Sequence, residues 1–306
     1  MLHRRHALIG GLCLCCLPSP ARARSFTLRE IALGIHIRRG VDEEASPGNA
    51  DAIANAGFII GRDAVLVVDP GGSLADGAAL RAMIRQKTSL PIRFVVMSHV
   101  HPDHIFGAGA FLEDKPAFVG HARLGAALAA RGDYYRQRLE EILGPGAAGP
   151  VVMPTMIVAD AAEIDLGGRV VRVNAHRPAH TDNDLSLFDA ESGTLLAADL
   201  LFVGRVPSLD GSLLGWLKEL EALKAVGARQ AVPGHGPERV DWPAGCADLA
   251  RYLRTLVEET RQAVKDNIGI EAAIERIGAA ERGRWTLFEE YHGRNVTQAY
   301  KELEWE

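Results

Sequence analysis

Hydrophobic residues along the first half of the chain form short continuous runs separated by one amphipathic stretch. The runs at 57–60, 65–68 and 94–97 are bounded by polar or turn residues, as expected of buried strands. Leu80 and Ile84 give the stretch between the second and third runs the apolar face of a helix. This half of the chain is therefore expected to fold as strands followed by a helix.

The same alternation continues to the C-terminus. A short strand is expected at 118–119, followed by a long helix at 123–143 that ends at Gly144-Pro145-Gly146. The second half is expected to open with strands near 156–158 and 170–174, and to continue with strands at 185–188, 194–198 and 230–232. A helix is expected at 214–223, and helical periodicity begins again at Ala244. Clusters of strands between helices predict an α/β chain in which two sheets pack together with helices outside.

The first 23 residues have a different pattern. Arg4 and Arg5 are followed by an apolar stretch at 7–17, too short to span a bilayer, and by small residues around Arg22. This pattern is typical of a signal peptide over residues 1–23, which predicts a periplasmic or secreted protein; the alternative is a short N-terminal anchor. Arg4-Arg5 followed by His6-Ala7-Leu8 also resembles a twin-arginine signal, with ordinary secretion as the alternative. The remaining residues, 24–306, are expected to form one domain with C-terminal helices.

Composition narrows the classes of partner. The chain has 306 residues, 47% of them hydrophobic and 24% charged, and a net charge of -5. No lysine or arginine stripe is present, so we expect no nucleic-acid partner and no stable membrane insertion after signal removal, but rather a small-molecule substrate. Three of the four cysteines lie in the signal segment, which leaves Cys246 alone and excludes an intramolecular disulfide in the mature chain.

The densest chemical feature is the run His99-Val100-His101-Pro102-Asp103-His104. In an extended segment His99 and His101 point to the same side, so both imidazoles can bind one ion at about 2.0 Å. Pro102 interrupts the strand, and the turn that follows can aim Asp103 and His104 at a neighbouring position. The run therefore predicts two adjacent metal ions, the alternative being a solvated turn.

Three further residues follow apolar runs later in the chain: His180, Asp199 and His235. A single histidine after a strand is more often a surface or capping residue. Their recurrence in order behind the first cluster favours a metal site collected from several strand ends. Glycines on both sides of His235 would also allow the backbone to approach a ligand closely.

With these residues in place, the chain resembles the metallo-β-lactamase superfamily over roughly residues 28–240. The resemblance implies a four-layered αββα sandwich and a divalent-metal site holding two Zn²⁺ ions. It further implies that the first ion is bound by His99, His101 and His180, that the second is bound by Asp103, His104 and His235, and that Asp199 bridges them. Asp69, which ends a strand, matches the family's strand-end aspartate that supports the ligands.

Asp199 separates branches of this superfamily. Many β-lactamases carry cysteine at the position of Asp199, whereas an aspartate there resembles glyoxalase II-like hydrolases. Together with the export signal, the stretches 205–212 and 215–217 most resemble quinoprotein relay system zinc metallohydrolases and similar proteins of sulfur-oxidation clusters. This resemblance implies a periplasmic quinoprotein dehydrogenase as a partner, but it implies no particular substrate.

The expected chemistry is hydrolysis. Two zinc ions about 3.5–4 Å apart can share a hydroxide and lower the pKa of the bound water toward about 7. That hydroxide would attack the carbonyl of an ester, lactone, thioester or amide, with Asp103 or Asp199 as the catalytic residue that orients the water and takes its proton. Arg205 and Asp210 are candidates for substrate contact, although a surface ion pair is the simpler interpretation.

Two alternatives remain open at this point. One is an iron-dependent oxidoreductase of the same fold that acts on a thiol or persulfide, and the other is a non-catalytic periplasmic accessory protein of a quinoprotein. Structural zinc sites are usually closed sets of four ligands, so seven ligands on two ions favour the enzyme. His121, His176 and Cys246 match no ligand position and are expected to be structural.

Overall fold

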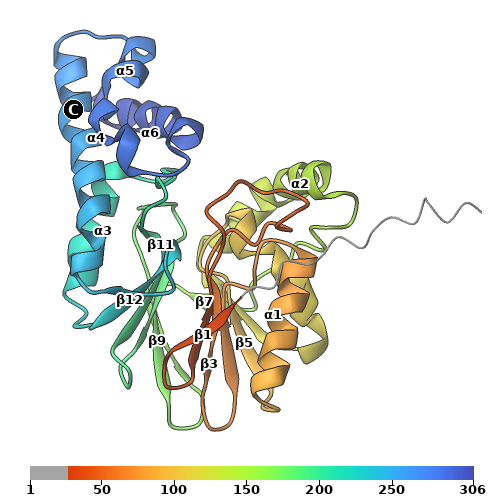
Figure 1. Cartoon of the computed structure of the whole chain (residues 1–306). Coiled ribbons are helices and arrows are strands. Elements are labelled where there is room, and N and C mark those ends of the chain that lie inside the picture. Colours follow the sequence, from red (N-terminus) through yellow and green to blue (C-terminus); the bar gives the residue numbers. More distant parts are fainter. Residues whose placement is uncertain (1–26) are drawn as a thin grey trace, which may run out of the picture.

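The computed structural model describes residues 27–306, so the signal peptide predicted at 1–23 lies outside the described residues. Two β-sheets face each other, and helices cover the outer face of each sheet (Figure 1). The α/β class and the four-layered αββα sandwich expected from the sequence are thus confirmed. The seven candidate metal ligands lie together at one edge of this sandwich.

The first sheet has seven strands in sequential order, β1 to β7. They are β1 (Leu28–Ala32), β2 (Ile35–Arg38), β3 (Ala56–Ile60), β4 (Val65–Val68), β5 (Ile92–Val96), β6 (Ala117–His121) and β7 (Met156–Val158). The strands β1 to β4 pair antiparallel, whereas β4 to β7 pair parallel. Parallel pairing brings the carboxyl ends of β4, β5 and β6 to one edge.

The second sheet has six strands, in the order β13-β12-β11-β10-β9-β8. They are β8 (Ala161–Asp165), β9 (Val170–Ala175), β10 (Leu185–Asp189), β11 (Thr194–Phe202), β12 (Gln230–His235) and β13 (Val240–Asp241). Only β11 and β12 pair parallel. Asp199, within the second half of β11, and His235, the last residue of β12, lie at the edge where β5 ends.

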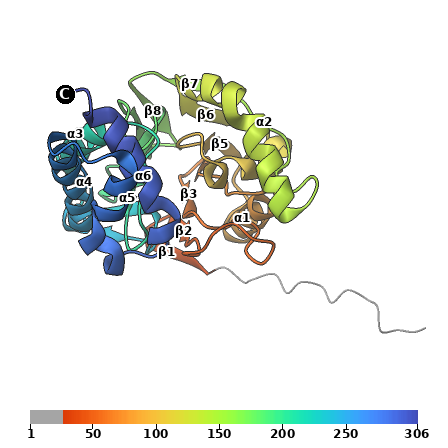
Figure 2. The same ribbon diagram turned by 90° about the horizontal axis from the view of Figure 1, so that it is seen from above.

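Helices lie outside both sheets. They are α1 (Leu74–Lys87), α2 (Leu124–Leu143), α3 (Leu213–Lys224), α4 (Ala247–Lys265), α5 (Ile270–Arg276) and α6 (Phe288–Leu303). From above, α1 and α2 lie on the side of the first sheet and α3 to α6 on the side of the second (Figure 2). Among residues 27–306, no helix combines the length and the apolar content that a membrane span requires.

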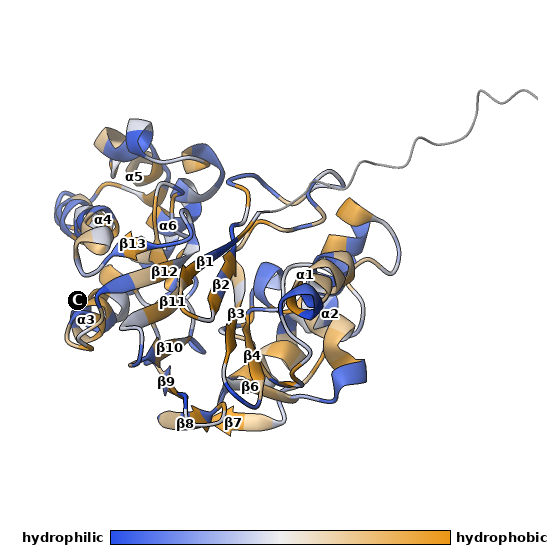
Figure 3. Ribbon diagram, turned by 60° about the horizontal axis from the view of Figure 1, so that its bottom comes forward, coloured by the Kyte–Doolittle hydropathy of each residue, from blue (hydrophilic) through white to orange (hydrophobic). Residues whose placement is uncertain are grey.

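Three apolar layers hold the four structural layers together. The middle layer joins the inner faces of the sheets, for example through Leu66 and Val96 of the first and Val173 and Leu187 of the second. A second layer packs the first sheet against α1 and α2, and a third packs the other sheet against α3, α4 and α6. Strands of the first sheet such as β3, β4 and β6 are mainly hydrophobic (Figure 3). Their near-continuous apolar runs follow from burial on both faces.

The structure differs from the sequence expectation in the middle of the chain. The strand at 156–158 was expected to open the second half, but β7 pairs with β6 and closes the first sheet. The strand expected at 194–198 continues to Phe202, so Asp199 lies inside β11 rather than beyond its end. The strands β1, β2 and β8 were not expected, and β1 and β8 give weak signals because they have exposed faces with charged residues.

A buried ion pair joins the two sheets at the edge opposite the candidate metal ligands. Arg169 donates from Nε and Nη2 to the carboxylate of Asp189, with both distances at 2.9 Å. Its remaining nitrogen, Nη1, donates to the carbonyl oxygens of Leu33 at 2.8 Å and Ile60 at 3.2 Å in the first sheet. The Arg169 guanidinium thus donates hydrogen bonds to acceptors in both sheets.

We expect Arg169→Leu to lower the free energy of unfolding by about 3–5 kcal/mol, because it leaves the Asp189 carboxylate buried without its cation. Arg172→Leu is the matched control, since Arg172 is exposed on the same hairpin. Denaturant unfolding of both variants measures the difference. Equal stabilities would show that the pair does not hold the sheets together.

Candidate metal centre

Three histidine rings converge at the edge where β5 ends. His99 and His101 follow β5, and His180 lies in the connection between β9 and β10. His180 Nε2 lies 3.2 Å from His99 Nε2 and 2.9 Å from His101 Nδ1, while His99 Nε2 lies 3.0 Å from His101 Nδ1. Two nitrogen ligands of one tetrahedral zinc ion lie roughly 3.3 Å apart. The three nitrogens therefore have the mutual spacing of a ligand set.

A second group lies beside the first. Asp103 and His104 occupy a single 3₁₀ turn, Pro102–His104, and His235 is the last residue of β12. Asp103 Oδ2 lies 3.4 Å from His104 Nε2 and 3.2 Å from His235 Nε2. The strand β5 ends at Val96, and residues 99–101 form a bend rather than the extended segment expected from the sequence. Pro102 begins the 3₁₀ turn that carries Asp103 and His104, as the sequence indicated.

Asp199 lies between the two groups. Its Oδ2 is 3.3 Å from His180 Nε2 and 3.5 Å from His235 Nε2, and its Oδ1 is 3.1 Å from His104 Nε2. The preceding residue, Ala198, has a φ of 46°, at an irregularity in the pairing of β11 with β12. Such a conformation is uncommon outside glycine, and it accompanies the turn of the Asp199 carboxylate toward both sets of rings.

Gly234 makes room for that carboxylate. A Cβ at Gly234 would lie 1.9 Å from Asp199 Oδ1. The sequence suggested that glycines around His235 let the backbone approach a ligand. In the structure, Gly234 instead lets β12 approach the Asp199 side chain.

The outward-facing ring nitrogens of His99, His104 and His180 are engaged by protein acceptors. Asp69 Oδ2 accepts from His104 Nδ1 at 2.9 Å and from Ser98 Oγ at 2.9 Å, and Ser98 Oγ in turn accepts from His99 Nδ1 at 2.9 Å. His180 Nδ1 donates to the Ser208 carbonyl at 2.6 Å. When these rings are neutral, the bonds orient the lone pair of each of the three inward nitrogens toward a cation.

Asp69 anchors this outer set. It has a φ of 54° at the end of β4, a conformation that aspartate tolerates better than most residues. Besides His104 and the Ser98 hydroxyl, it accepts from the Ser98 backbone N–H at 2.8 Å. The supporting role that the family resemblance implied for Asp69 agrees with these contacts.

Electrostatics also favour a cation here. Burial lowers the pKa of His180 to about 3, and burial followed by the charge of His104 lowers the pKa of His99 well below its ordinary value. Burial alone would raise the pKa of Asp103 and Asp199, but the neighbouring histidines, His104 foremost, together outweigh burial and hold both pKa values well below the usual range. Neutral rings of His99 and His180 and ionised carboxylates are the protonation states of metal ligands. Burial alone would lower the pKa of His104 and His235, but the neighbouring carboxylates, Asp199 foremost, raise both, so a bound cation would replace their protons.

Two buried polar atoms give an independent test of fit. His104 Nε2 and Asp199 Oδ1 make no hydrogen bond, although both are shielded from solvent. These two atoms lie 3.1 Å apart, and buried polar atoms without a hydrogen bond are destabilising. Divalent cations bound by His99, His101, His180 and Asp199 and by Asp103, His104 and His235 would satisfy them.

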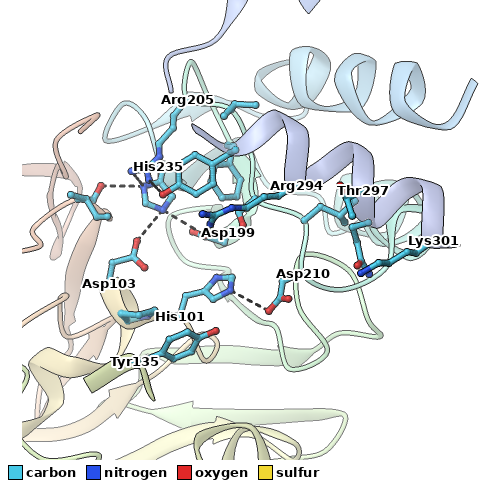
Figure 4. Close-up of a pocket in the computed structure, with 18 residues that line it drawn as sticks. His101, Asp103, Tyr135, Asp199, Arg205, Asp210, His235, Arg294, Thr297 and Lys301 are labelled. Carbon is cyan, nitrogen blue, oxygen red and sulfur yellow. Dashed lines mark hydrogen bonds and ion pairs between the residues drawn. The ribbon is translucent and has the colours of Figure 1, made fainter. Parts of the chain in front are cut away.

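An open cavity of about 490 Å³ adjoins the cluster (Figure 4). His101, Asp103, Asp199 and His235 form part of its floor. Arg205 and Asp210, which the sequence marked as substrate-contact candidates or surface pairs, both line it. Arg205 is buried, with Nη1 3.2 Å from His235 Nδ1, whereas Asp210 pairs with Arg131 of α2 and lies 3.5 Å from His101 Nε2.

Sequence reasoning missed Ser98 and the residues that α2 and α6 add to the cavity wall: Tyr135, Tyr291, Arg294, Thr297, Gln298 and Lys301. The sequence spacing of residues 294, 297, 298 and 301 is that of residues on one helix face, so it could have indicated this part of the wall. His121 and His176 lie outside both ligand groups, as expected; His176 bonds Glu219 and Ser186 instead. Cys246 is buried, which raises the pKa of its thiol.

Comparison with known proteins agrees with this arrangement. The family model of the metallo-beta-lactamase superfamily matches residues 50–235, which include every candidate ligand. A metallo-beta-lactamase from Pontibacter korlensis superposes with a TM-score of 0.62 at 16% identity, covering 75% of this chain and 99% of the other. One from Hirschia baltica gives 0.56 at 16% identity, covering 71% and 93%. At this identity the two structures show the fold alone.

One relative with a similar sequence is named for an activity other than β-lactam hydrolysis. The linear primary-alkylsulfatase of Pseudomonas sp. (strain ATCC 19151) is 24% identical over an alignment of 211 residues, which covers 57% of this chain. The match covers only 40% of that relative's length. The relative therefore has a large part with no counterpart in the match.

We expect Asp69→Asn to weaken metal binding about 10–100-fold, because an amide cannot accept from the Ser98 hydroxyl, the Ser98 N–H and His104 together. Competition with a chromophoric chelator measures the affinity of each site. Unchanged affinity at both sites would exclude the supporting role.

We expect Gly234→Ala to weaken metal binding by about 10–100-fold, because the new methyl group displaces the Asp199 carboxylate. Gly125→Ala on α2 is the matched control, since its Cβ would only contact Met153 Cε at 3.6 Å. The same chelator competition measures both variants. If the two bound metal equally well, Gly234 would not be needed to seat Asp199.

Proposed function

The chain belongs to the metallo-β-lactamase superfamily, and we propose that it is a hydrolase that uses two divalent metal ions, Zn²⁺ in the first instance. The observation that carries this proposal is the open cavity over the ligands. His101, Asp103, Asp199 and His235 border a space of about 490 Å³, so ions held there would remain accessible to water and substrate. A purely structural zinc site would be closed by its four ligands.

The residues around the site supply the rest of the chemistry. When bound, the two ions would make water a nucleophile near neutral pH and polarise the group that it attacks. Asp103, whose Oδ2 lies beside His104 and His235, accepts the proton of the attacking water. Asp199 orients that water between the groups. The buried ring of Phe202, stacked on His235, shields one side from solvent.

The proposed substrates are esters, lactones, thioesters and amides, in which the water attacks a carbonyl carbon. Hydrolysis of a primary alkyl sulfate is a second candidate, favoured by the match to the linear primary-alkylsulfatase. The match covers 40% of that relative, so its activity enters here only as a candidate. Both reactions would use the same ligands and the same proton acceptor.

Location and partners remain proposals based on the sequence. The pattern of residues 1–23 supports a periplasmic or secreted protein, exported by the twin-arginine or the general route. The resemblance of the 205–217 region to quinoprotein relay system hydrolases supports a periplasmic quinoprotein dehydrogenase as partner. Iron-dependent persulfide oxidation and a non-catalytic accessory role are the competing functions.

We expect zinc-loaded protein to hydrolyse at least one member of a panel of ester, lactone, thioester, amide and primary alkyl sulfate substrates. Chelation should abolish this activity, and added Zn²⁺ should restore it. His101→Ala, which removes a ligand that lines the cavity, should reduce the rate by at least about 100-fold.

His121→Ala is the matched control for loss of an imidazole, because His121 lies outside both ligand groups. Circular dichroism checks the folding of both variants. Oxygen consumption on persulfide by iron-loaded protein, without hydrolysis by zinc-loaded protein, would establish the oxidoreductase instead. Inactivity of both forms on every substrate would favour the accessory role.

A further inference from the structure

One face of α6 forms the wall of the cavity beyond the metal ligands. Arg294, Thr297, Gln298 and Lys301 all line the cavity, and their spacing of three and four residues places them along a single helix face. Figure 4 shows Arg294, Thr297 and Lys301 in a row along this helix. The face therefore presents two cations, about 10 Å apart along the helix axis, to whatever occupies the cavity.

Arg294 and Lys301 have no charged partner among the described residues. Within residues 27–306, neither side chain forms a hydrogen bond or an ion pair, and both are exposed. The other charged residues of the wall have partners. Asp210 pairs with Arg131, and Arg205 contacts His235, the hydroxyl of Tyr291 at 3.2 Å and the carboxylate of Glu44 at 3.7 Å. The cavity thus has two uncompensated positive charges in a chain whose net charge is -5.

These cations are held on a fixed support. The connection after β11 runs along α6 and is bonded to it at several points: Asn295 accepts from the Leu209 N–H at 2.9 Å and donates to the Pro207 carbonyl at 2.7 Å, and Gln298 donates to the Gly211 carbonyl at 3.1 Å. Near the end of α6, Glu302 accepts from the Ser212 hydroxyl at 2.7 Å. The helix face is therefore positioned by the segment that also supplies Ser208 to His180.

Apolar side chains complete the cavity. Ile53, Pro102, Phe202, Val206 and Leu209 line it together with the polar residues. An apolar surface beside two free cations suits a molecule with a hydrocarbon body and an anionic group. The carboxylates of Asp103 and Asp199 do not disfavour such an anion, because they would be neutralised by bound divalent cations.

We propose that the substrate carries an oxyanion, such as a carboxylate or sulfonate, separated by an apolar segment from the bond that is cleaved, and that Arg294 and Lys301 bind this anion. The inference rests on the proposed hydrolase function, since it assigns a substrate class to the same cavity. It assigns specificity to a helix outside residues 50–235, the part of the chain that matches the family model.

Binding of an inert ligand tests the proposal without turnover. Hexane-1-sulfonate and the neutral hexane-1-sulfonamide have the same hydrocarbon chain, and a sulfonate is a weak metal ligand. We expect metal-loaded protein to bind the sulfonate about tenfold more tightly in calorimetric titration, and the preference to shrink as salt is raised. The double variant R294Q/K301Q should lose the preference.

Lys265→Gln is the matched control, because Lys265 is an exposed cation on α4 that does not line the cavity. It should keep the preference for the sulfonate. Equal binding of the two ligands by the unmodified protein would overturn the proposal. So would a preference that survives in R294Q/K301Q, since the anion would then be bound elsewhere.

Turnover tests the same inference on a substrate. The 4-nitrophenyl hemiester of adipate and 4-nitrophenyl hexanoate have acyl chains of equal length, and only the first ends in a carboxylate. After subtraction of uncatalysed hydrolysis, we expect kcat/KM to favour the hemiadipate, and R294Q/K301Q to reduce that ratio about tenfold, chiefly through KM.

The two proposals fail differently. If no substrate is hydrolysed but the sulfonate is bound selectively through Arg294 and Lys301, the hydrolase proposal fails and anion recognition stands. If both 4-nitrophenyl esters are hydrolysed with equal kcat/KM and the sulfonate shows no preference, the hydrolase proposal stands and the inference about α6 is wrong.

Discussion

The structure depends on the convergence of negative charge and ring nitrogens from both sheets at a single edge. Asp199 is buried there, and Asp103 is partly buried, among the rings of His104, His180 and His235. Buried carboxylates need compensating positive charge, and this geometry suits divalent cations. The parallel pairs β4-β5 and β11-β12 meet this requirement by ending at the same place. The three apolar layers then fix the distance between the two sheets, and with it the distances between ligands.

The segment from Gly204 to Ser212 connects parts of the site that are remote in sequence. Its Ser208 carbonyl accepts from His180, Asp210 lies beside His101, and its N–H and carbonyl groups bond the side chains of α6. The metal ligands and the outer wall of the cavity are therefore supported by the same backbone. A displacement of this segment would alter the orientation of the rings and the shape of the cavity together.

The sequence predicted the site better than it predicted the sheets. His99 to His104 could be interpreted because the ligands are adjacent and Pro102 marks the change of direction. His180, Asp199 and His235 were found because each follows an apolar run, and the family resemblance then implied which ion each would bind. The hydrophobic pattern did not predict strands β1 and β8, because their exposed faces carry charged residues. Asp199 was expected beyond a strand because the local irregularity at Ala198 has no signal in the sequence. The α6 wall was also missed, since periodicity reveals a helix face but not which neighbour it meets.

The candidate metal ligands and the cavity wall of α6 lie in different parts of the sequence, and this separation has an evolutionary consequence. All the candidate ligands fall within residues 50–235, whereas α6 begins at Phe288, beyond the part of the chain that matches the family model. The candidate metal centre and the surface that we propose selects the substrate are thus encoded by separate stretches of the gene. Exchange or drift of the C-terminal stretch could redirect such a protein toward new compounds while its metal chemistry stayed intact. A protein built in this way can acquire new substrates without rebuilding its catalyst.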